Sequence, residues 1–272
     1  MVDKPISMLS PAKVNLMLRV LCRRPDGYHE LQTCFKILNW GDEMTFNFSP
    51  EIEATNVTIS GFPGLQVTDN LIYKAAQLLK PWVSTPCNVD IDVLKRIPQG
   101  GGLGGGSSNA ATTLKVLNDK WGCKLSQKEL MVQALKLGAD VPVFINSSDA
   151  IATGVGEILE DIILPKQYVL LLFPKCKVPT ESVFKDSELN RNQVAVHREE
   201  AKKSKFWVND CLPVVLKKYS EIKRVFDALS IHYTVFLSGT GSTLFMVFDD
   251  SEAAEKAKKM AQTICSCHLI YC

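Results

Sequence analysis

Apolar and polar side chains alternate between residues 11 and 20 and predict a β-strand, because alternate positions of a strand face opposite sides. One face of this strand carries Val14, Leu16, Leu18 and Val20. The opposite face carries Lys13, Asn15, Met17 and Arg19. Lys13 and Asn15 are therefore expected on the same face, where such a pair alone is typical of a solvated strand.

The rest of the chain predicts short strands and helices in irregular alternation. Strands are expected over residues 31–38, 44–48, 57–60, 88–97, 168–173, 234–237, 244–248 and 264–271. A helix is expected over residues 70–79, with Leu71, Ala75 and Leu78 on one stripe. Two more are expected to begin at Ser107-Ser108 and after the capping box Ser126 to Glu129. The last two are expected over residues 213–229 and 252–263. Turns are expected at Pro25-Asp26-Gly27 and at Gly154-Val155-Gly156. This pattern favours two packed α/β layers in each half, with residues 164–167 as the candidate linker.

Composition and charge exclude several classes of protein. The 272 residues are 46% hydrophobic and 22% charged, which is typical of a globular chain with a full core. The formal net charge is only +2 and the charges are dispersed, so a nucleic-acid partner is not expected. The longest apolar run, residues 168–173, is far shorter than a membrane helix requires. The N-terminus lacks the apolar core of a secretion signal, and we expect a bacterial, cytoplasmic protein.

The nine cysteines indicate reduced, buried thiols rather than a disulfide framework, because their number is odd and the chain is long. Cys265, Cys267, His268 and Cys272 could suggest a metal site. The same segment also has the alternation of a final strand, and zinc ligands usually come from two separated pairs. No metal-ligating residues are therefore predicted.

A loop with six glycines in seven positions surrounds Leu103. Each glycine costs about 0.5–1 kcal/mol relative to alanine in regular structure, so an ordinary surface loop does not favour this composition. A loop whose backbone N–H groups must approach a phosphate does favour many glycines, particularly where the loop leads into a helix, as here at Ser107-Ser108. A Walker A loop would need a lysine after Gly106, and the protein-kinase motifs are missing. A dinucleotide fold would need a second strand soon after the helix, where another helix is expected instead.

The loop resembles the ATP-phosphate loop of the GHMP small-molecule kinases, from Pro98 to Ala111. Other segments are similar to the 4-diphosphocytidyl-2-C-methyl-D-erythritol kinase family within that group. These are Pro11-Ala-Lys-Val-Asn-Leu16, Asp26-Gly-Tyr-His29, Asp69-Asn-Leu71, Gly138-Ala-Asp-Val-Pro-Val-Phe144, Ala152 to Glu157, Thr180 to Phe184 and Leu237-Ser-Gly-Thr-Gly241. The match spans nearly the whole chain in order. Asn209-Asp210-Cys211-Leu212 departs from the family's usual pattern, so no contact is predicted there.

The resemblance implies an α+β, two-domain GHMP-kinase-like fold. Each domain would be a layered α/β sandwich with a mostly antiparallel sheet, and the active site would lie in the cleft between them. The N-terminal, ATP-binding domain is expected over residues 1–164 and the C-terminal domain over residues 165–272. The expected reaction is phosphorylation of the 2-hydroxyl group of 4-diphosphocytidyl-2-C-methyl-D-erythritol by ATP with Mg²⁺, in the non-mevalonate pathway to isoprenoid precursors.

Site residues follow from the resemblance, position by position. Lys13 and Asp140 match the family's catalytic lysine and aspartate, although Asp140 alone could be a simple helix cap. At an effective dielectric constant of about 20, an ammonium about 4 Å from a carboxylate gains about 4 kcal/mol, which would keep the acid ionised. The expected ATP-binding residues are Pro98, Gly100, Gly101, Gly102, Leu103, Gly104, Gly105, Gly106, Ser107, Ser108, Asn70, Leu71 and Lys95. The expected substrate-binding residues are Asn15, Tyr28, His29, Thr180, Phe184, Gly239 and Thr240.

Three other functions compete with this hypothesis. A GHMP kinase for another alcohol would bind no cytidine nucleotide. A non-catalytic nucleotide sensor would be favoured if Lys13 or Asp140 were missing, and a dinucleotide oxidoreductase would bind NADH. The favoured hypothesis needs a small-molecule cytidine diphosphate substrate and no obligate protein, nucleic-acid or membrane partner.

Overall fold

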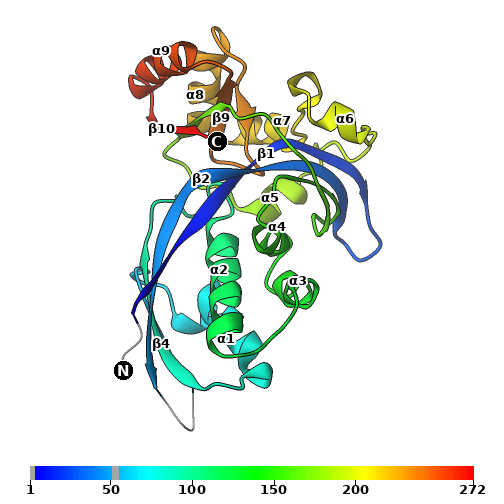
Figure 1. The fold of residues 1–272 in the computed structure, drawn as a ribbon. Helices are drawn as coiled ribbons and strands as arrows, with labels where there is room; N and C mark the ends of the chain where they lie inside the picture. The colour runs from blue at the N-terminus through cyan, green and yellow to red at the C-terminus, as the bar shows by residue number, and fades with distance from the viewer. Residues whose placement is uncertain (1–3, 51–54) are drawn as a thin grey trace. The chain divides into compact units, whose positions relative to one another are not determined.

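The computed structural model describes residues 4–50 and 55–272, and these form two compact units (Figure 1). The first unit contains residues up to Ala12, Trp40–Gln99 and Gly104–Ser147. The second contains Lys13–Asn39, Gly100–Leu103 and Ser148–Cys272. Each unit thus combines segments that are far apart in the sequence. The expected domain boundary after residue 164 remains a prediction.

Strands β1 (Ile6–Arg23) and β2 (His29–Pro50) each supply residues to both units. The expected turn joins them, with Gly27 at φ +88° and the N–H of Arg24 bonded to the carbonyl of Tyr28 at 2.8 Å. The two strands expected over residues 31–38 and 44–48 are a single strand, so that expectation was wrong. Gly41 lies within it, and a Cβ there would come 2.0 Å from the carbonyl oxygen of Ser10. This glycine permits a close approach of backbone rather than a turn.

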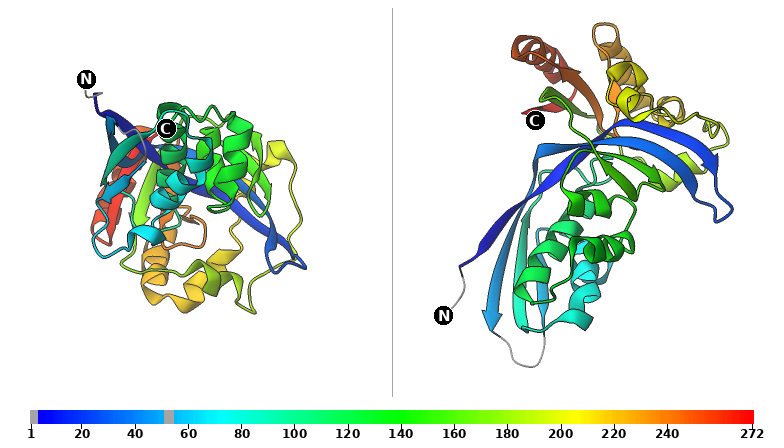
Figure 2. Two further views of the ribbon diagram at one scale, coloured as in Figure 1. Left: turned by 90° about the horizontal axis from the view of Figure 1, so that it is seen from below. Right: turned by 45° about the vertical axis from the view of Figure 1, so that its right-hand side comes forward.

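In the first unit, the second half of β2 pairs antiparallel with β4 (Cys87–Leu94), and β4 pairs in parallel with β3 (Val57–Ser60). Its helices are α1 (Leu71–Leu79), α2 (Gly105–Lys120), α3 (Gln127–Leu135) and α4 (Val141–Asn146), with 3₁₀ turns at Val67–Asp69 and Lys80–Trp82. These helices gather on one face of the strands (Figures 1 and 2). Alternate side chains of β2 and β4, such as Phe46 and Ile91, are buried there.

Two helical expectations in this unit need correction. The buried stripe of α1 is Ile72, Ala75, Ala76 and Leu79, not Leu71, Ala75 and Leu78. Both stripes have helical spacing, so the sequence alone did not separate them. Helix α2 begins at Gly105, two residues earlier than expected, because Gly104 adopts the left-handed conformation just before it. The capping box of α3 is confirmed, with Ser126 and Glu129 bonded reciprocally.

In the second unit, the first half of β2 pairs antiparallel with β5 (Ala150–Gly154), which pairs with β6 (Ile158–Asp161). A second, antiparallel sheet follows the order β10-β7-β9-β8 and consists of β7 (Tyr168–Phe173), β8 (Phe236–Leu237), β9 (Leu244–Phe248) and β10 (Ser266–Tyr271). The helices are α5 (Thr180–Phe184), α6 (Arg198–Ala201), α7 (Cys211–Lys218), α8 (Ser220–Ser230) and α9 (Ser251–Gln262), with a 3₁₀ turn at Ser204–Phe206. One core joins side chains of α7, α8 and α9 to those of β7 and β9.

The single helix expected over residues 213–229 was wrong, because two helices occupy this segment. Tyr219 separates them with an extended backbone at φ −120° and ψ 91°. Its hydroxyl group lies 3.2 Å from the Oγ atom of Ser182. No glycine or proline marks this break in the sequence.

All nine cysteines lie in the described residues and are free thiols, but only Cys34, Cys123, Cys211 and Cys272 are buried, so the expectation that all would be buried was wrong. Burial raises the pKa of Cys34 and of Cys211 to about 12, so these two thiols resist ionisation. Cys267 and His268 lie within β10, as the alternation predicted, but the strand begins at Ser266, so Cys265 precedes it. Among the described residues, no helix combines the length and apolar character that crossing a membrane requires.

Candidate active site

The predicted site residues divide between the two units. The second unit contains Lys13, Asn15, Tyr28, His29, Gly100, Gly101, Gly102, Leu103, Thr180, Phe184, Gly239 and Thr240. The first contains Asn70, Leu71, Lys95, Pro98, Gly104, Gly105, Gly106, Ser107, Ser108 and Asp140. The glycine loop passes from one unit to the other between Leu103 and Gly104.

Lys13 is a buried cation on β1, with a residue exposure of only 2%. Its Nζ atom donates a hydrogen bond of 2.6 Å to Oδ1 of Asn15 and lies 5.4 Å from the centre of the Phe35 ring. A buried ammonium is costly unless it is hydrogen-bonded. The expected shared face of Lys13 and Asn15 is therefore confirmed, but it is buried rather than solvated.

Asn15 is held in one orientation by a relay of hydrogen bonds. Its Nδ2 atom donates to Oγ1 of Thr33 at 2.8 Å, and Thr33 donates in turn to the carbonyl oxygen of Met17 at 2.6 Å. Because the amide nitrogen is used in this way, the amide oxygen faces the ammonium of Lys13. Thr33 was not found by sequence reasoning, since a threonine in a strand gives no functional signal. The contact of Asn15 with substrate stays a prediction.

The first part of the glycine loop is bonded to this cluster through its backbone. The N–H of Lys13 donates to the carbonyl of Leu103 at 3.0 Å, and the N–H of Thr243 donates to that of Gly101 at 3.1 Å. Ser238 donates its hydroxyl to the carbonyl of Gly102 at 2.9 Å. A Cβ on Gly102, where φ is +75°, would come 2.2 Å from the carbonyl oxygen of Ser238. Only glycine fits at this position.

The second glycine turn, predicted to face substrate, lies against the first. Gly239 has φ +57°, and a Cβ there would be 3.4 Å from Oδ1 of Asn15. Thr240 is buried, and its hydroxyl lies 3.1 Å from that of Thr180. Nδ2 of Asn209 donates to the carbonyls of Leu237 and Gly239 at 2.7 and 2.8 Å. Asn209, which the sequence analysis left without a role, thus fixes this turn.

The residues predicted for the cytidine end meet at the start of β2 and the end of α5. The rings of His29 and Phe184 stack, with centroids 5.3 Å apart and planes inclined by 29°. Burial, and then the positive charges of Arg191 and Arg23, lower the pKa of His29 below its ordinary value of 6.5. Tyr28, in contrast, is 66% exposed.

In the first unit, the second part of the glycine loop forms the start of α2. The N–H groups in the first turn of a helix have no partner within the helix and attract anions. Ser108 is fully buried, and its Oγ accepts a hydrogen bond of 2.8 Å from Ser10. Ser107 is only partly buried. Of the two serines at this helix start, Ser107 is therefore better placed to meet a ligand.

A buried carboxylate supports the same helix start. Asp42 has no solvent exposure and forms an ion pair with Lys95. Its oxygens also accept hydrogen bonds from the backbone N–H groups of Arg96 and Ile97 and from Nδ2 of Asn109, at 2.7, 2.9 and 3.0 Å. Lys95 thus has a structural partner, and its contact with ATP stays a prediction.

Asn70 and Leu71 begin α1, beside the glycine loop. Asn70 is buried and caps the helix, with its Oδ1 accepting from the N–H of Ile72 at 2.9 Å. A Cβ on Gly106 would lie 3.6 Å from Cδ1 of Leu71, which is partly exposed. The pair therefore borders the loop, and its contact with adenosine also stays a prediction.

We expect Asp42→Ala to lower the free energy of unfolding by about 3–5 kcal/mol, because it removes the buried carboxylate that pairs with Lys95 and leaves the N–H groups of Arg96 and Ile97 without their acceptor. Urea unfolding would measure this loss. Asp92→Ala, which removes an exposed carboxylate from β4, is the matched control and should cost about 1 kcal/mol or less. Equal losses for the two variants would contradict the supporting role of Asp42.

Asp140 occupies the N-cap position of α4, but its side chain does not cap the helix. Its backbone is in the right-handed helical region, with φ −84° and ψ −8°, whereas a capping aspartate usually adopts the β region. The residue is partly exposed. The capping role that could have explained this aspartate is therefore absent.

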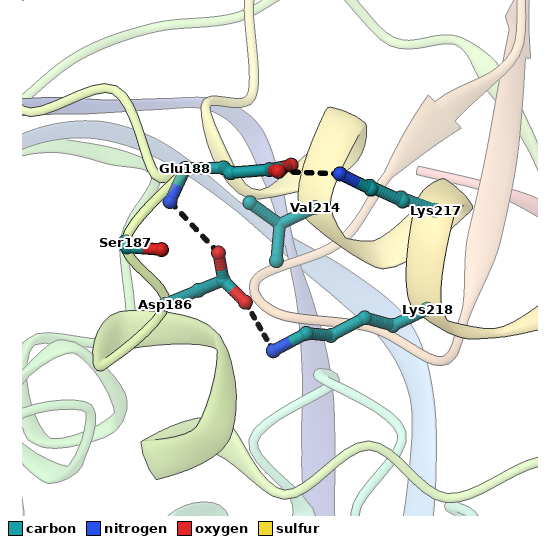
Figure 3. Close-up of a pocket in the computed structure, with 6 residues that line it drawn as sticks. All are labelled: Asp186, Ser187, Glu188, Val214, Lys217 and Lys218. Carbon is teal, nitrogen blue, oxygen red and sulfur yellow. Dashed lines mark hydrogen bonds and ion pairs between the residues drawn. The ribbon is translucent and has the colours of Figure 1, made fainter.

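A pocket of about 280 Å³ lies in the second unit (Figure 3). It is lined by Asp186, Ser187, Glu188, Val214, Lys217 and Lys218. The two carboxylates are paired with the two lysines across it. None of the predicted site residues lines this pocket, so it is not part of the candidate active site.

Comparison with known proteins identifies the family. Residues 70–155 match the model of the GHMP kinases N terminal domain, and residues 198–266 match that of the GHMP kinases C terminal. A 4-diphosphocytidyl-2-C-methyl-D-erythritol kinase of Burkholderia ambifaria is 40% identical over 94% of this chain and 89% of its own. The same enzyme of a Marinomonas species is 42% identical over 93% and 83%. The chain belongs to the family of 4-diphosphocytidyl-2-C-methyl-D-erythritol kinases.

A solved structure supports the same family. The crystal structure of a 4-(cytidine 5'-diphospho)-2C-methyl-D-erythritol kinase matches with a TM-score of 0.82 and 31% identity, over 98% of each chain. Membership of the family confirms the expected resemblance, the α+β GHMP fold and the expectation of an ATP-dependent small-molecule kinase. It favours neither the oxidoreductase nor the non-catalytic sensor.

Proposed function

We propose that this chain transfers the terminal phosphoryl group of ATP to the 2-hydroxyl group of 4-diphosphocytidyl-2-C-methyl-D-erythritol. The products are the 2-phosphate and ADP, and the reaction belongs to the non-mevalonate pathway to isoprenoid precursors. One observation carries the proposal. In a chain of this family, Lys13, the glycine loop and the second glycine turn are joined by hydrogen bonds in one cluster.

Asp140 orients the acceptor hydroxyl and takes its proton late in the reaction. A carboxylate of ordinary basicity is a weak base toward an alcohol. Phosphoryl transfer tolerates this, because its loose transition state requires mainly positioning and neutralisation of charge. Membership of the family supports the assignment, because Asp140 stands in the segment from Gly138 to Phe144 that resembles the family.

Lys13 neutralises charge that develops on the transferred phosphoryl group. The ammonium is held by Asn15, which Thr33 orients in turn, so it needs little reorganisation during the reaction. Preorganised charge of this kind is usually the largest single contribution to catalysis. Asn15 contacts the substrate through the hydrogen-bonding positions of its amide group that Lys13 and Thr33 do not occupy.

The phosphates of ATP bind the backbone of the loop from Pro98 to Ser108, and its adenosine contacts Asn70, Leu71 and Lys95. The free N–H groups and dipole of α2 favour the phosphates at this end of the loop. Mg²⁺ would supply further neutralisation of the phosphates. Magnesium in phosphoryl-transfer sites usually keeps several waters and relies on substrate oxygens, and a single hydroxyl such as that of Ser107 fits such a site.

The cytidine end of the substrate contacts Tyr28, His29 and Phe184, with Thr180 nearby, and its phosphates approach Gly239 and Thr240. Aromatic faces stack on a pyrimidine, and an imidazole hydrogen-bonds its edge. The stacked His29 and Phe184 rings support this assignment. We further propose that the enzyme works in the cytoplasm, since ATP is supplied there and nine free thiols suit a reducing compartment.

A coupled ADP assay tests the proposed function. Purified protein with Mg-ATP is given the cytidine diphosphate substrate, a different small alcohol, or no acceptor, and CDP is added as a competitor. We expect ADP only with the first acceptor, and we expect CDP to inhibit its release. ADP release that requires a different alcohol, or that CDP does not inhibit, would contradict the proposed substrate and favour another GHMP kinase reaction.

His29 should make the stability of the protein depend on pH. The pKa of His29 is lower in the folded chain than the ordinary 6.5. At pH values between the folded pKa and 6.5, the unfolded chain therefore binds more protons than the folded chain. The contribution of neutral His29 is complete above pH 6.5 and is lost as the pH falls toward the folded pKa. We expect His29→Phe to reduce this loss, measured by urea unfolding from pH 8 to pH 5. An unchanged pH dependence in the variant would contradict the assignment.

A further inference from the structure

Arg191 is the centre of a hydrogen-bonded cluster that the sequence analysis did not find. Its Nε atom donates to Nε2 of His29 at 3.0 Å. Nη2 donates to the carbonyls of Phe184 and Asp186 at 2.8 and 2.6 Å, and Nη1 donates to that of Leu189 at 3.0 Å. The same guanidinium therefore binds the imidazole ring of His29 and the backbone carbonyl of Phe184, the two residues whose rings stack.

The contact between Arg191 and His29 determines where the imidazole carries its proton. A guanidinium group only donates hydrogen bonds, so Nε2 of His29 must accept through its lone pair. A neutral imidazole has one N–H, which must then lie on Nδ1. The lowered pKa of His29 keeps the ring neutral near pH 7. The carbonyls of Phe184, Asp186 and Leu189 hold the arginine in place, so the tautomer is imposed by the fold.

A donor at this nitrogen distinguishes the two common pyrimidine bases. Ring atom N3 of cytosine is an acceptor, whereas N3 of uracil carries a hydrogen and is a donor. An Nδ1–H group therefore pairs with cytosine N3 and opposes uracil N3–H. Sites that leave a polar group unpaired against the wrong ligand discriminate strongly, because the desolvation cost of that group is not recovered.

We propose that Arg191 is a positioning residue that makes the enzyme select cytosine over uracil, by holding His29 in the tautomer with the proton on Nδ1. The inference rests on the proposed function, because it takes His29 to contact the base. It extends that function by naming the atom that reads the base and the residue that sets its state.

Nucleotide binding tests the proposal without requiring turnover. The dissociation constants of CDP and UDP are measured by calorimetry for the wild type, Arg191→Met and Arg198→Met. Arg198 is the matched control, since it also donates to a backbone carbonyl, that of Asp161, but from α6. We expect the wild type and Arg198→Met to prefer CDP by about tenfold or more. Arg191→Met should lose most of this preference, because Nδ1 of its freed imidazole can present a lone pair to uracil. A variant that keeps the full preference would overturn the proposal.

A second pair of measurements separates positioning from a general loss of structure. In a His29→Phe background, Arg191→Met should leave the ratio of the two dissociation constants unchanged, since no tautomer remains to be set. Nitrogen-15 spectra of histidine-labelled protein should show the proton of His29 on Nδ1 in the wild type. A proton on Nε2 would overturn the proposal, whether or not the enzyme phosphorylates its expected substrate. Binding of CDP with the predicted preference but without ADP release would instead contradict the proposed function alone.

Discussion

Asp140→Asn is expected to lower kcat by about 10²- to 10⁴-fold, the range typical of removing a group that accepts a proton in the transition state. Asparagine keeps the shape of the side chain but cannot take the proton of the acceptor hydroxyl. The Asp140 side chain does not cap α4, so the change removes no cap from this helix. The measurement is ADP release at saturating ATP and cytidine diphosphate substrate, with ATP affinity determined separately.

Asp250→Asn is the matched control for this substitution. Asp250 caps α9 by accepting from the N–H of Ala253 at 2.8 Å, and asparagine caps helices as well as aspartate. The control should therefore keep wild-type turnover and stability. Wild-type turnover in Asp140→Asn would contradict the assignment of the base, and a loss of ATP affinity with unchanged kcat would point to a binding role instead.

Gly102→Ala is expected to lower kcat/KM for ATP by about 10²-fold or more. The new methyl group would come 2.2 Å from the carbonyl oxygen of Ser238 and 3.0 Å from that of Gly241. Both contacts are with backbone, so the loop itself must move, and a displacement of about 1 Å can cost 10²-fold in rate. Steady-state kinetics with varied ATP would measure the effect.

Gly100→Ala separates this steric effect from simple backbone strain. Gly100 also has a positive φ, of +69°, but a Cβ there would meet nothing within 4 Å. Alanine at Gly100 should cost only the left-handed conformation, about 1–2 kcal/mol of stability, and should largely keep its activity. If both alanine variants lost activity equally, the packing of Gly102 against Ser238 would not be what positions the loop.

Much of the fold could be predicted from local signals in the sequence. The alternation of residues 11–20, the apolar run of residues 168–173 and the capping box at Ser126 each depend on residues close together in the chain, and all three elements are present. Gly41, within the continuous β2, instead lies against Ser10, and Tyr219, at the break between α7 and α8, contacts Ser182; both partners are distant in sequence. Such contacts have no periodic pattern that could reveal them.

The candidate site shows the same division. Lys13, Asp140 and the glycine loop stand within recognisable motifs, and an unusual run of glycines is visible in any sequence. Ser238 and Asn209 act by bonding to backbone carbonyls of loops, and Arg191 acts through an imidazole 162 residues away. Serine, asparagine and arginine are common at protein surfaces, so their types alone gave no signal. Only the structure joins these three residues to their partners.

The identity of the phosphorylated product tests the central claim most directly. Wild-type protein is incubated with Mg-ATP and 4-diphosphocytidyl-2-C-methyl-D-erythritol, and the product is examined by phosphorus NMR. We expect one new phosphate monoester, on the 2-hydroxyl group, in an amount equal to the ADP formed. Phosphorylation of a different hydroxyl group, or bound ATP that yields no new ester, would contradict the account.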